Sequence, residues 1–168
     1  LYLNETQREV FYMKKFDFDA WPTDDSIKIK LGAGQYKVAV FVDPNCPWCK
    51  RFFEEDIDKL TDIDFYVFLT SVLGEESEEL SAAIYASKNP HEAWKNWIMN
   101  EEKPKAVAGE AQREIVDRNT KLFDELKNET VPAVYLGNGD GPFGFMTALE
   151  LVSKIEHLCK NSNLVSHL

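Results

Sequence analysis

The chain has 168 residues, of which 44% are hydrophobic, and its formal charge is −10. This length and composition suit one domain whose core needs neither a metal ion nor a disulfide to hold it. The acidic charge argues against a surface for nucleic acid or anionic membranes, because such surfaces need clustered lysine and arginine. We also expect no membrane span, since no apolar run of the sequence approaches the roughly 18 to 20 residues that a span needs.

The N-terminal part of the chain carries weaker signals. The start, LYLNETQREVF, lacks the charged and apolar regions of a signal peptide. If the protein is exported, we expect its targeting segment to have been removed. The stretch IKIKL alternates like an edge strand. We interpret residues 1–35 as an N-terminal extension or linker.

A strand, a helix and a second strand follow in the chain. YKVAVFV and IDFYVFL are short and nearly all apolar, which is typical of strands buried on both faces. Between them, CKRFFEEDIDKL has apolar residues at helical spacing. The pattern predicts a parallel pair of strands joined by a helical crossover.

A helical insertion is expected next, at about 76–127. Its three helical stretches are SEELSAAIYASK, NPHEAWKNWIM and a longer one at about 105–126. Ser77 is the expected cap of the first and Asn89 the cap of the second. Trp94 and Trp97 lie three residues apart, so we expect both on the buried face.

The last part of the chain predicts a hairpin and a closing helix. VPAVYLGNGDGPFGF contains a strand, a glycine and asparagine turn, and a second short strand. In TALE, Thr147 and Glu150 have the spacing of a capping box. Cys159 falls on the apolar face of this helix. The whole pattern predicts an α/β domain at 36–160, a central mixed sheet flanked by helices, with a tail at 161–168.

Two cysteines two residues apart stand in DPNCPWCK, which begins at position 43. They could be half of a zinc site, a structural disulfide or a redox pair. A structural zinc site needs four ligands, and the other candidates are Cys159 and three histidines. A structural disulfide across so short a loop would stabilise little. A redox pair is favoured, and we expect no metal and no cofactor.

The predicted position of this pair explains how a thiol there becomes reactive. If Cys46 caps the helix, Pro47 takes the first helical position, where its missing N–H costs nothing. The N–H groups of Trp48 and Cys49 can then meet the Cys46 sulfur, and two basic residues follow. Similar settings lower a cysteine pKa from about 8.5 to roughly 3.5 to 7.5. We therefore expect Cys46 to be the exposed nucleophile and Cys49 the inner, resolving thiol.

With FVDPNCPWCKRF and the later VPA, the chain resembles the thioredoxin-fold thiol–disulfide oxidoreductases, and most of all the catalytic domains of the bacterial periplasmic Dsb isomerases, DsbC and DsbG. The resemblance covers about 37–160. It implies that Cys46 attacks, that Cys49 resolves, and that Pro132 faces them after a cis bond from Val131. A cis bond is accessible at modest cost only before proline. The Val131 backbone, with Pro47 and Trp48, would then contact an extended substrate segment.

Three departures from that family bear on function. Val40 stands where thioredoxins have an acidic residue. Val131 stands before the proline, where the isomerases usually have threonine and the DsbA oxidase has valine. The residues ahead of Lys37 are too few for the N-terminal dimerisation domain of DsbC and DsbG, so we expect a fragment or a different family member.

Three functions therefore stay open. The first is a periplasmic isomerase or reductase, the second a net oxidase of the DsbA kind, and the third a non-catalytic module that binds peptides beside Pro132. For the two enzymes, the expected partners are disulfide-bearing or reduced protein substrates and a redox-partner protein.

Overall fold

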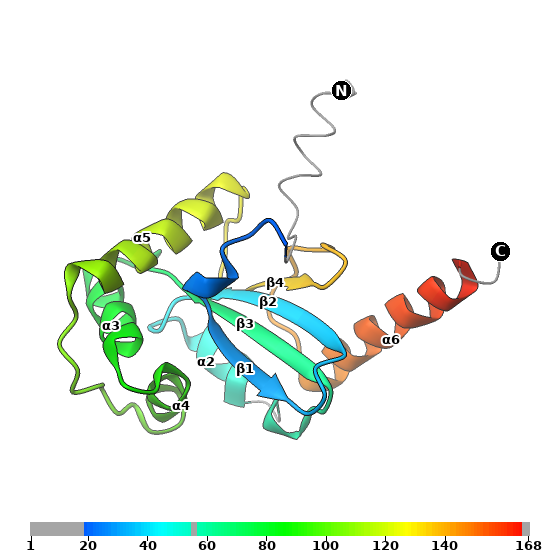
Figure 1. The fold of residues 1–168 in the computed structure, drawn as a ribbon, viewed down its shortest axis with the longest axis horizontal. Helices are drawn as coiled ribbons and strands as arrows, with labels where there is room; N and C mark the ends of the chain where they lie inside the picture. Colours follow the sequence, from blue (N-terminus) through cyan, green and yellow to red (C-terminus); the bar gives the residue numbers. More distant parts are fainter. Residues whose placement is uncertain (1–18, 55–56, 166–168) are drawn as a thin grey trace.

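A four-stranded sheet with helices packed on both faces forms the centre of the molecule (Figure 1). The computed structural model describes residues 19–54 and 57–165. In chain order the elements are η1 (Thr23–Asp25), β1 (Ile27–Leu31), β2 (Tyr36–Val42), α2 (Pro47–Glu54), η2 (Ile57–Lys59), β3 (Ile63–Leu69), α3 (Glu75–Ala86), α4 (Pro90–Asn100), α5 (Glu110–Glu125), β4 (Ala133–Leu136) and α6 (Ala148–Val165). The expected α/β architecture is confirmed.

The sheet is mixed, with the strand order β1-β3-β2-β4. The central strands β2 and β3 are parallel, and Val40 lies beside Val67 in their register. β1 pairs antiparallel with β3 at one edge, and β4 pairs antiparallel with β2 at the other. The parallel pair predicted around the cysteine motif is thus confirmed, because α2 and η2 join β2 to β3.

The described chain before β2 belongs to the same sheet. The alternating stretch IKIKL forms β1, an edge strand as predicted. Trp21, further upstream, is buried against β2 and β4, with its ring centroid 5.9 Å from that of Phe41 and 5.4 Å from that of Tyr135. The sheet and its core therefore begin before residue 36, where the sequence placed the domain boundary.

Two apolar cores lie on opposite faces of β2. Val38, Val40 and Val42 point into a large core with α2, α4 and α6, whereas Ala39 and Phe41 point into a smaller core with α5. Successive side chains of a strand alternate between faces, so a strand covered on both sides is apolar throughout. The end of β2 is thereby held rigidly at the point where the cysteine motif begins.

The helical insertion between the halves of the sheet consists of α3, α4 and α5, as predicted, and Trp94 and Trp97 are buried. Asn89 caps α4, because its side chain accepts a hydrogen bond from the Glu92 N–H at 3.2 Å. The prediction that Ser77 caps α3 is wrong. Ser77 lies in the first turn of that helix, where its hydroxyl donates to a buried carboxylate instead. α5 begins at Glu110, later than expected.

The hairpin expected after the insertion is shorter than predicted. β4 has four residues, and the returning chain pairs with it through one bridge, between Val134 and Phe143. The amide groups of these two residues exchange hydrogen bonds of 2.8 and 2.9 Å. Pro142, which precedes the bridge, has no N–H to donate, and a proline of this kind interrupts a strand ladder.

The closing helix, α6, starts as predicted and ends later. The Thr147 hydroxyl accepts a hydrogen bond from the Glu150 N–H at 3.2 Å, which confirms the cap. The helix continues to Val165, so most of the expected tail at 161–168 is helical. It extends away from the sheet on the side opposite α3, α4 and α5 (Figure 1). Among the described residues, α6 included, no helix is both long and apolar enough to cross a bilayer.

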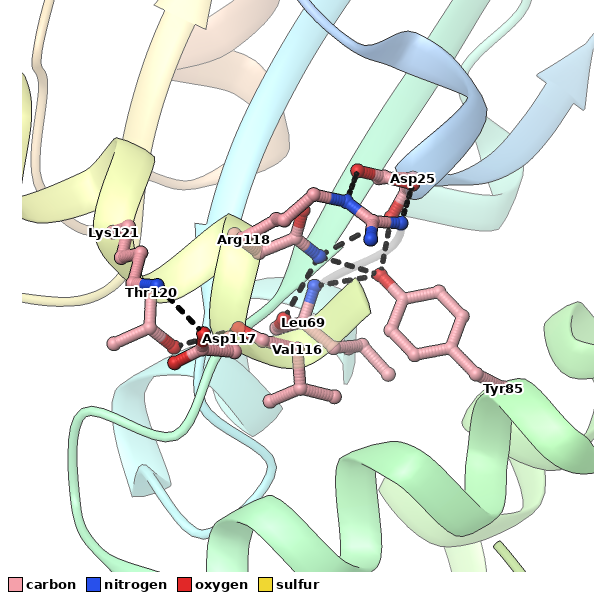
Figure 2. Close-up of polar contacts among 9 residues, drawn as sticks. Asp25, Leu69, Tyr85, Val116, Asp117, Arg118, Thr120 and Lys121 are labelled. Atoms are coloured by element: carbon pink, nitrogen blue, oxygen red, sulfur yellow. Dashed lines mark hydrogen bonds and ion pairs between the residues drawn. The ribbon is translucent and has the colours of Figure 1, made fainter. Parts of the chain in front are cut away.

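A buried polar network fixes α3 and α5 against the end of β3 (Figure 2). The Tyr85 hydroxyl accepts from the Leu69 N–H at 3.1 Å and donates to the Asp25 carbonyl at 2.6 Å. The Arg118 guanidinium donates to both carboxylate oxygens of Asp25, at 2.8 and 2.9 Å. The buried Asn119 amide donates to the Leu69 carbonyl at 3.0 Å. The network therefore ties α3, α5 and η1 to the end of β3.

We expect Tyr85→Phe to lower the free energy of unfolding by about 1 to 3 kcal/mol, because it leaves buried groups such as the Leu69 N–H without their partner. Tyr135→Phe is the matched control. Its hydroxyl donates a 2.6 Å hydrogen bond to the half-buried Asn128, whose side chain can turn to water. Urea denaturation of both variants measures the difference, and equal losses would show that the network does not act as described.

Candidate active site

The cysteine motif lies at the junction of β2 and α2. Cys46 occupies the capping position of α2, since its carbonyl accepts the first helical hydrogen bond, from the Lys50 N–H at 3.1 Å. Pro47 is the first helical residue, as predicted. The Cys46 N–H donates to the Asp43 carbonyl at 3.0 Å, which closes the turn between strand and helix. The Cys46 sulfur is thus held at the end of α2 that carries the unpaired N–H groups.

The loop before β4 faces this sulfur. The Val131–Pro132 peptide bond is cis, as the resemblance implied. The Cys46 thiol lies 3.5 Å from the Val131 carbonyl oxygen and donates a hydrogen bond to it. Residues that are 85 positions apart in the chain therefore meet at one point.

The exposure of the two cysteines differs from what we expected. Cys46 was predicted to be exposed, but only 6% of its surface is accessible, and Cys49 is completely buried. The Val131 carbonyl contacts the Cys46 sulfur, so the loop before β4 helps to shield Cys46 from solvent. Trp48, between the two cysteines, is 52% exposed. Only a small part of Cys46 is thus open to solvent, whereas the Trp48 ring two residues further along the chain is half exposed.

The pKa of Cys46 is lowered to about 6. The largest cause is a hydrogen bond that its sulfur accepts from the Cys49 thiol, and the N–H groups of Cys49 and Trp48 add to it. Burial and the Asp43 charge act in the opposite direction. The predicted hydrogen bonds from the helix N–H groups are confirmed, and the contribution of the Cys49 thiol is new. Near neutral pH the Cys46 sulfur is therefore mostly a thiolate.

Cys49 has the opposite character. Burial raises the pKa of its thiol far above the usual range, and the hydrogen bond that it donates to Cys46 raises this pKa further. Its sulfur also accepts a hydrogen bond from the Asp43 N–H. The two sulfurs are chemically distinct: one is an anion near the surface, and the other is a protonated thiol in the core.

The side chain of Asp43 is a buried carboxylate that the sequence analysis did not single out. It is fully inaccessible. One oxygen accepts from the Asn45 N–H at 2.8 Å and the Ser77 hydroxyl at 2.7 Å, and the other accepts from the Leu73 N–H at 2.9 Å. An aspartate directly after a nearly all-apolar strand was the available signal, because a charge there enters the core with the strand.

An aromatic surface adjoins the opening to Cys46. The Trp48 and Phe145 rings lie 5.1 Å apart between centroids, and the Arg51 guanidinium lies 5.5 Å from the first and 5.8 Å from the second. Phe145 was not predicted to be part of the site, because it lies almost a hundred residues from the motif in the chain. Together these side chains form a partly apolar platform beside the cysteine.

The basic residue Lys50 does not act mainly on the cysteines. Its ammonium group lies 3.0 Å from the Glu101 carboxylate and 4.3 Å from the centre of the Trp97 ring. The Trp97 indole N–H donates to the Pro44 carbonyl at 2.6 Å, within the loop that carries the cysteines. The α4 helix therefore supports the motif from outside the sheet, and the principal causes of the low Cys46 pKa lie elsewhere.

Two further positions discussed from the sequence are Val40 and Cys159. Val40, on β2, is buried in the large core, so the position at which thioredoxins have an acidic residue is apolar here. Cys159 is half-buried and, with Tyr36, lines a cavity of about 330 Å³ between the sheet and α6. Within residues 19–54 and 57–165, no three histidine, cysteine or acidic side chains gather in a way that could hold a metal ion.

Comparison with known proteins agrees with this geometry. The sequence model of the thioredoxin-like domain matches residues 23–158. The chain belongs to the thioredoxin-like domain family. A disulfide interchange protein from Neisseria gonorrhoeae has a similar structure, with a TM-score of 0.73 and 26% identity over 82% of this chain and 97% of that one. The thioredoxin fold implied by the sequence is therefore confirmed.

Relatives within the thioredoxin-like proteins include members of the Dsb group. The chain is 29% identical over 140 residues to a probable thiol:disulfide interchange protein DsbC from Bordetella pertussis, which covers 82% of this chain and 48% of that protein. It is 34% identical over 107 residues to the thiol:disulfide interchange protein DsbG of Escherichia coli, covering 58% and 42%. The chain thus spans about half the length of these relatives.

We expect the alkylation rate of Cys46 by iodoacetamide to rise with pH around a midpoint of about 6, because the thiolate is the reacting form. The lowered pKa also means that stabilisation of the reduced fold is complete above about pH 8.5, the usual thiol range, and is lost as pH falls through about 6. Cys46→Ser supplies the background from the other cysteines. A midpoint near that of a free thiol would contradict the described hydrogen bonding.

Replacing Cys49 tests the largest cause of this low pKa. Cys49→Ala removes the donor and should raise the pKa of Cys46 by about 1 to 2, since a hydrogen bond to an anion contributes about 1.5 to 3 kcal/mol. Cys49→Ser keeps a donating hydroxyl and should raise it less. Ultraviolet absorbance of the thiolate as a function of pH measures both, and identical shifts would assign the effect to packing.

Proposed function

We propose that this chain is the catalytic domain of a thiol–disulfide oxidoreductase that isomerises or reduces disulfides in exported proteins. The observation that carries the proposal is the contrast between the two sulfurs, a thiolate at Cys46 and a buried thiol at Cys49. A nucleophile and a second thiol one helical turn behind it are what disulfide exchange requires. The names of the DsbC and DsbG relatives, both interchange proteins, support the same reaction class.

In the first step, the Cys46 thiolate attacks one sulfur of a substrate disulfide. The substrate S–S bond breaks, a mixed disulfide forms through Cys46, and the other substrate sulfur leaves as a thiolate. The Val131 carbonyl, which accepts a hydrogen bond from Cys46 when that sulfur is protonated, lies next to the sulfur that reacts. No electrons are gained or lost overall at this step.

The mixed disulfide can then be resolved in two ways. Another thiolate of the substrate can attack the substrate sulfur that is bonded to Cys46. This forms a new substrate disulfide, releases the Cys46 thiolate and completes an isomerisation. Alternatively, Cys49 loses its proton and attacks Cys46, which forms a disulfide in the protein and leaves the substrate reduced by two electrons. A redox-partner protein would return the pair to the dithiol form.

The residues around the opening would bind the substrate. The backbone of Val131 and Pro132 borders Cys46 and suits an extended segment that passes across the sulfur. Pro47 and the half-exposed Trp48 follow Cys46 in the first turn of α2. A substrate chain would thus run between the loop and the first turn of α2.

The Cys46 pKa favours isomerase or reductase action over strong oxidation. Strongly oxidising DsbA has a cysteine pKa of about 3.5, whereas that of thioredoxin is about 7. A value of about 6 stabilises the reduced form by about 3 kcal/mol less than one of about 3.5. The presence of Val131, as in the oxidase, favours the net oxidase as the second candidate.

The expected partners and location follow from the same proposal. Substrates are proteins with wrong or surplus disulfides, and the resemblance to the Dsb isomerases suggests the periplasm, where such substrates are found. Fractionation of cells that express the full-length protein would test the location. Trapping with Cys49→Ser, in which the mixed disulfide cannot be resolved by the second cysteine, would identify the partners.

Separate assays distinguish the two enzymatic functions. We expect the wild type to restore activity to scrambled ribonuclease and to reduce insulin, and Cys46→Ala to do neither. Cys49→Ser should lose insulin reduction, which needs both sulfurs, yet keep part of the isomerase activity, which can finish through substrate thiols.

A result in which the wild type oxidises reduced ribonuclease but does not rescue the scrambled form would favour the net oxidase. If the wild type neither reduces, oxidises nor isomerises disulfides and Cys46→Ala still binds peptides, the non-catalytic binding module is the function that remains.

A further inference from the structure

The proposed reaction leaves the buried carboxylate of Asp43 without a role. Asp43 is the last residue before the active-site loop, and its carboxylate is fully inaccessible. Its backbone contacts both cysteines: its carbonyl accepts from the Cys46 N–H at 3.0 Å, and its N–H donates to the Cys49 sulfur. The carboxylate thus lies in the same low-dielectric region as the reacting pair.

Hydrogen bonds explain how this carboxylate can stay charged inside the protein. It accepts from the Asn45 N–H, the Ser77 hydroxyl and the Leu73 N–H, and the Ser77 hydroxyl accepts in turn from the Asn45 side chain at 2.9 Å. An ionised carboxylate prefers such donors, since burial without them would neutralise it. Ser77 comes from α3, so the insertion supplies part of the support.

A fixed anion at this place opposes a second anion at Cys46. Like charges in a poorly solvated region repel strongly, and the charge of Asp43 acts on the thiolate of Cys46 and on that of Cys49. We propose that Asp43 is an electrostatic tuning residue, whose carboxylate destabilises the Cys46 thiolate and makes the cysteine pair a weaker oxidant.

The consequence for the redox equilibrium follows from mass balance. The dithiol and glutathione disulfide give the Cys46–Cys49 disulfide and two glutathione thiols, with two electrons passing to glutathione. Anything that weakens the Cys46 thiolate destabilises the dithiol side and so shifts this equilibrium toward the protein disulfide. Asp43 would therefore move the pair away from net oxidation. This inference rests on the proposed function and adds a residue that tunes the direction of the reaction.

The other charged groups around the pair have different partners. Lys50 is paired with Glu101 and lies over the Trp97 ring, and Arg51 lies over Trp48. On the facing loop, the Val131 carbonyl is the group that meets the sulfur. Asp43, in contrast, contacts both cysteines through its backbone, and its charge acts on both sulfurs.

Two variants separate charge from loop geometry. Asp43→Asn removes the charge at nearly constant shape and should increase the thiolate-to-thiol ratio of Cys46 at a given pH by about tenfold. Its equilibrium with glutathione should shift toward the dithiol by up to about tenfold, or about 30 mV. Ser77→Ala removes one hydrogen bond from the same carboxylate. The charge of Asp43 remains but is less compensated, so the thiolate-to-thiol ratio of Cys46 should fall.

The readouts are thiolate absorbance against pH and the glutathione equilibrium, neither of which needs a substrate protein. Opposite shifts in the two variants support the inference. Shifts in the same direction would assign the effect to the geometry of the loop and overturn it, as would an unchanged ratio in Asp43→Asn. If Asp43→Asn does not fold, Ser77→Ala decides, because an unchanged or increased ratio contradicts a charge effect. Insulin reduction by the wild type tests the proposed function separately.

Discussion

The hydrogen bond from the Cys49 thiol to the Cys46 sulfur is the interaction on which the chemistry of this site depends. It lowers the pKa of the acceptor and raises that of the donor, so one contact creates both an anionic nucleophile and a protonated reserve. Two helix N–H groups strengthen the effect at Cys46, and burial strengthens it at Cys49. Without this asymmetry, two cysteines in one helical turn would be two ordinary thiols.

The rest of the fold holds that contact in place. β2 is covered on both faces and ends at the motif, while α4 anchors the loop through the hydrogen bond from Trp97 to the Pro44 carbonyl. α3 reaches the same loop through Ser77 and Asp43, and Val131 closes the site from the far side. Four separate parts of the chain thus meet around the cysteine motif and hold the loop that carries Cys46.

Much of this arrangement was predictable from local pattern. The apolar run at β2, the proline after Cys46 and the asparagine before α4 each predict a local structure, and each prediction is confirmed. Local pattern was misleading at Ser77, where a hydroxyl suited to a helix cap bonds instead to a carboxylate from another element. It also overstated the second hairpin strand, because the proline before Phe143 interrupts the pairing.

By itself, the sequence predicted the cysteine pair as the reactive site and determined which strand and helix present it, because periodicity and capping act over a few neighbouring residues. Only the tertiary structure decided how strongly each sulfur is perturbed. Burial of Cys46, its contact with Val131 and the charge of Asp43 beside it all depend on which distant segments pack together. A pKa responds to every dipole and charge within a few ångströms, and those neighbours come from the whole fold.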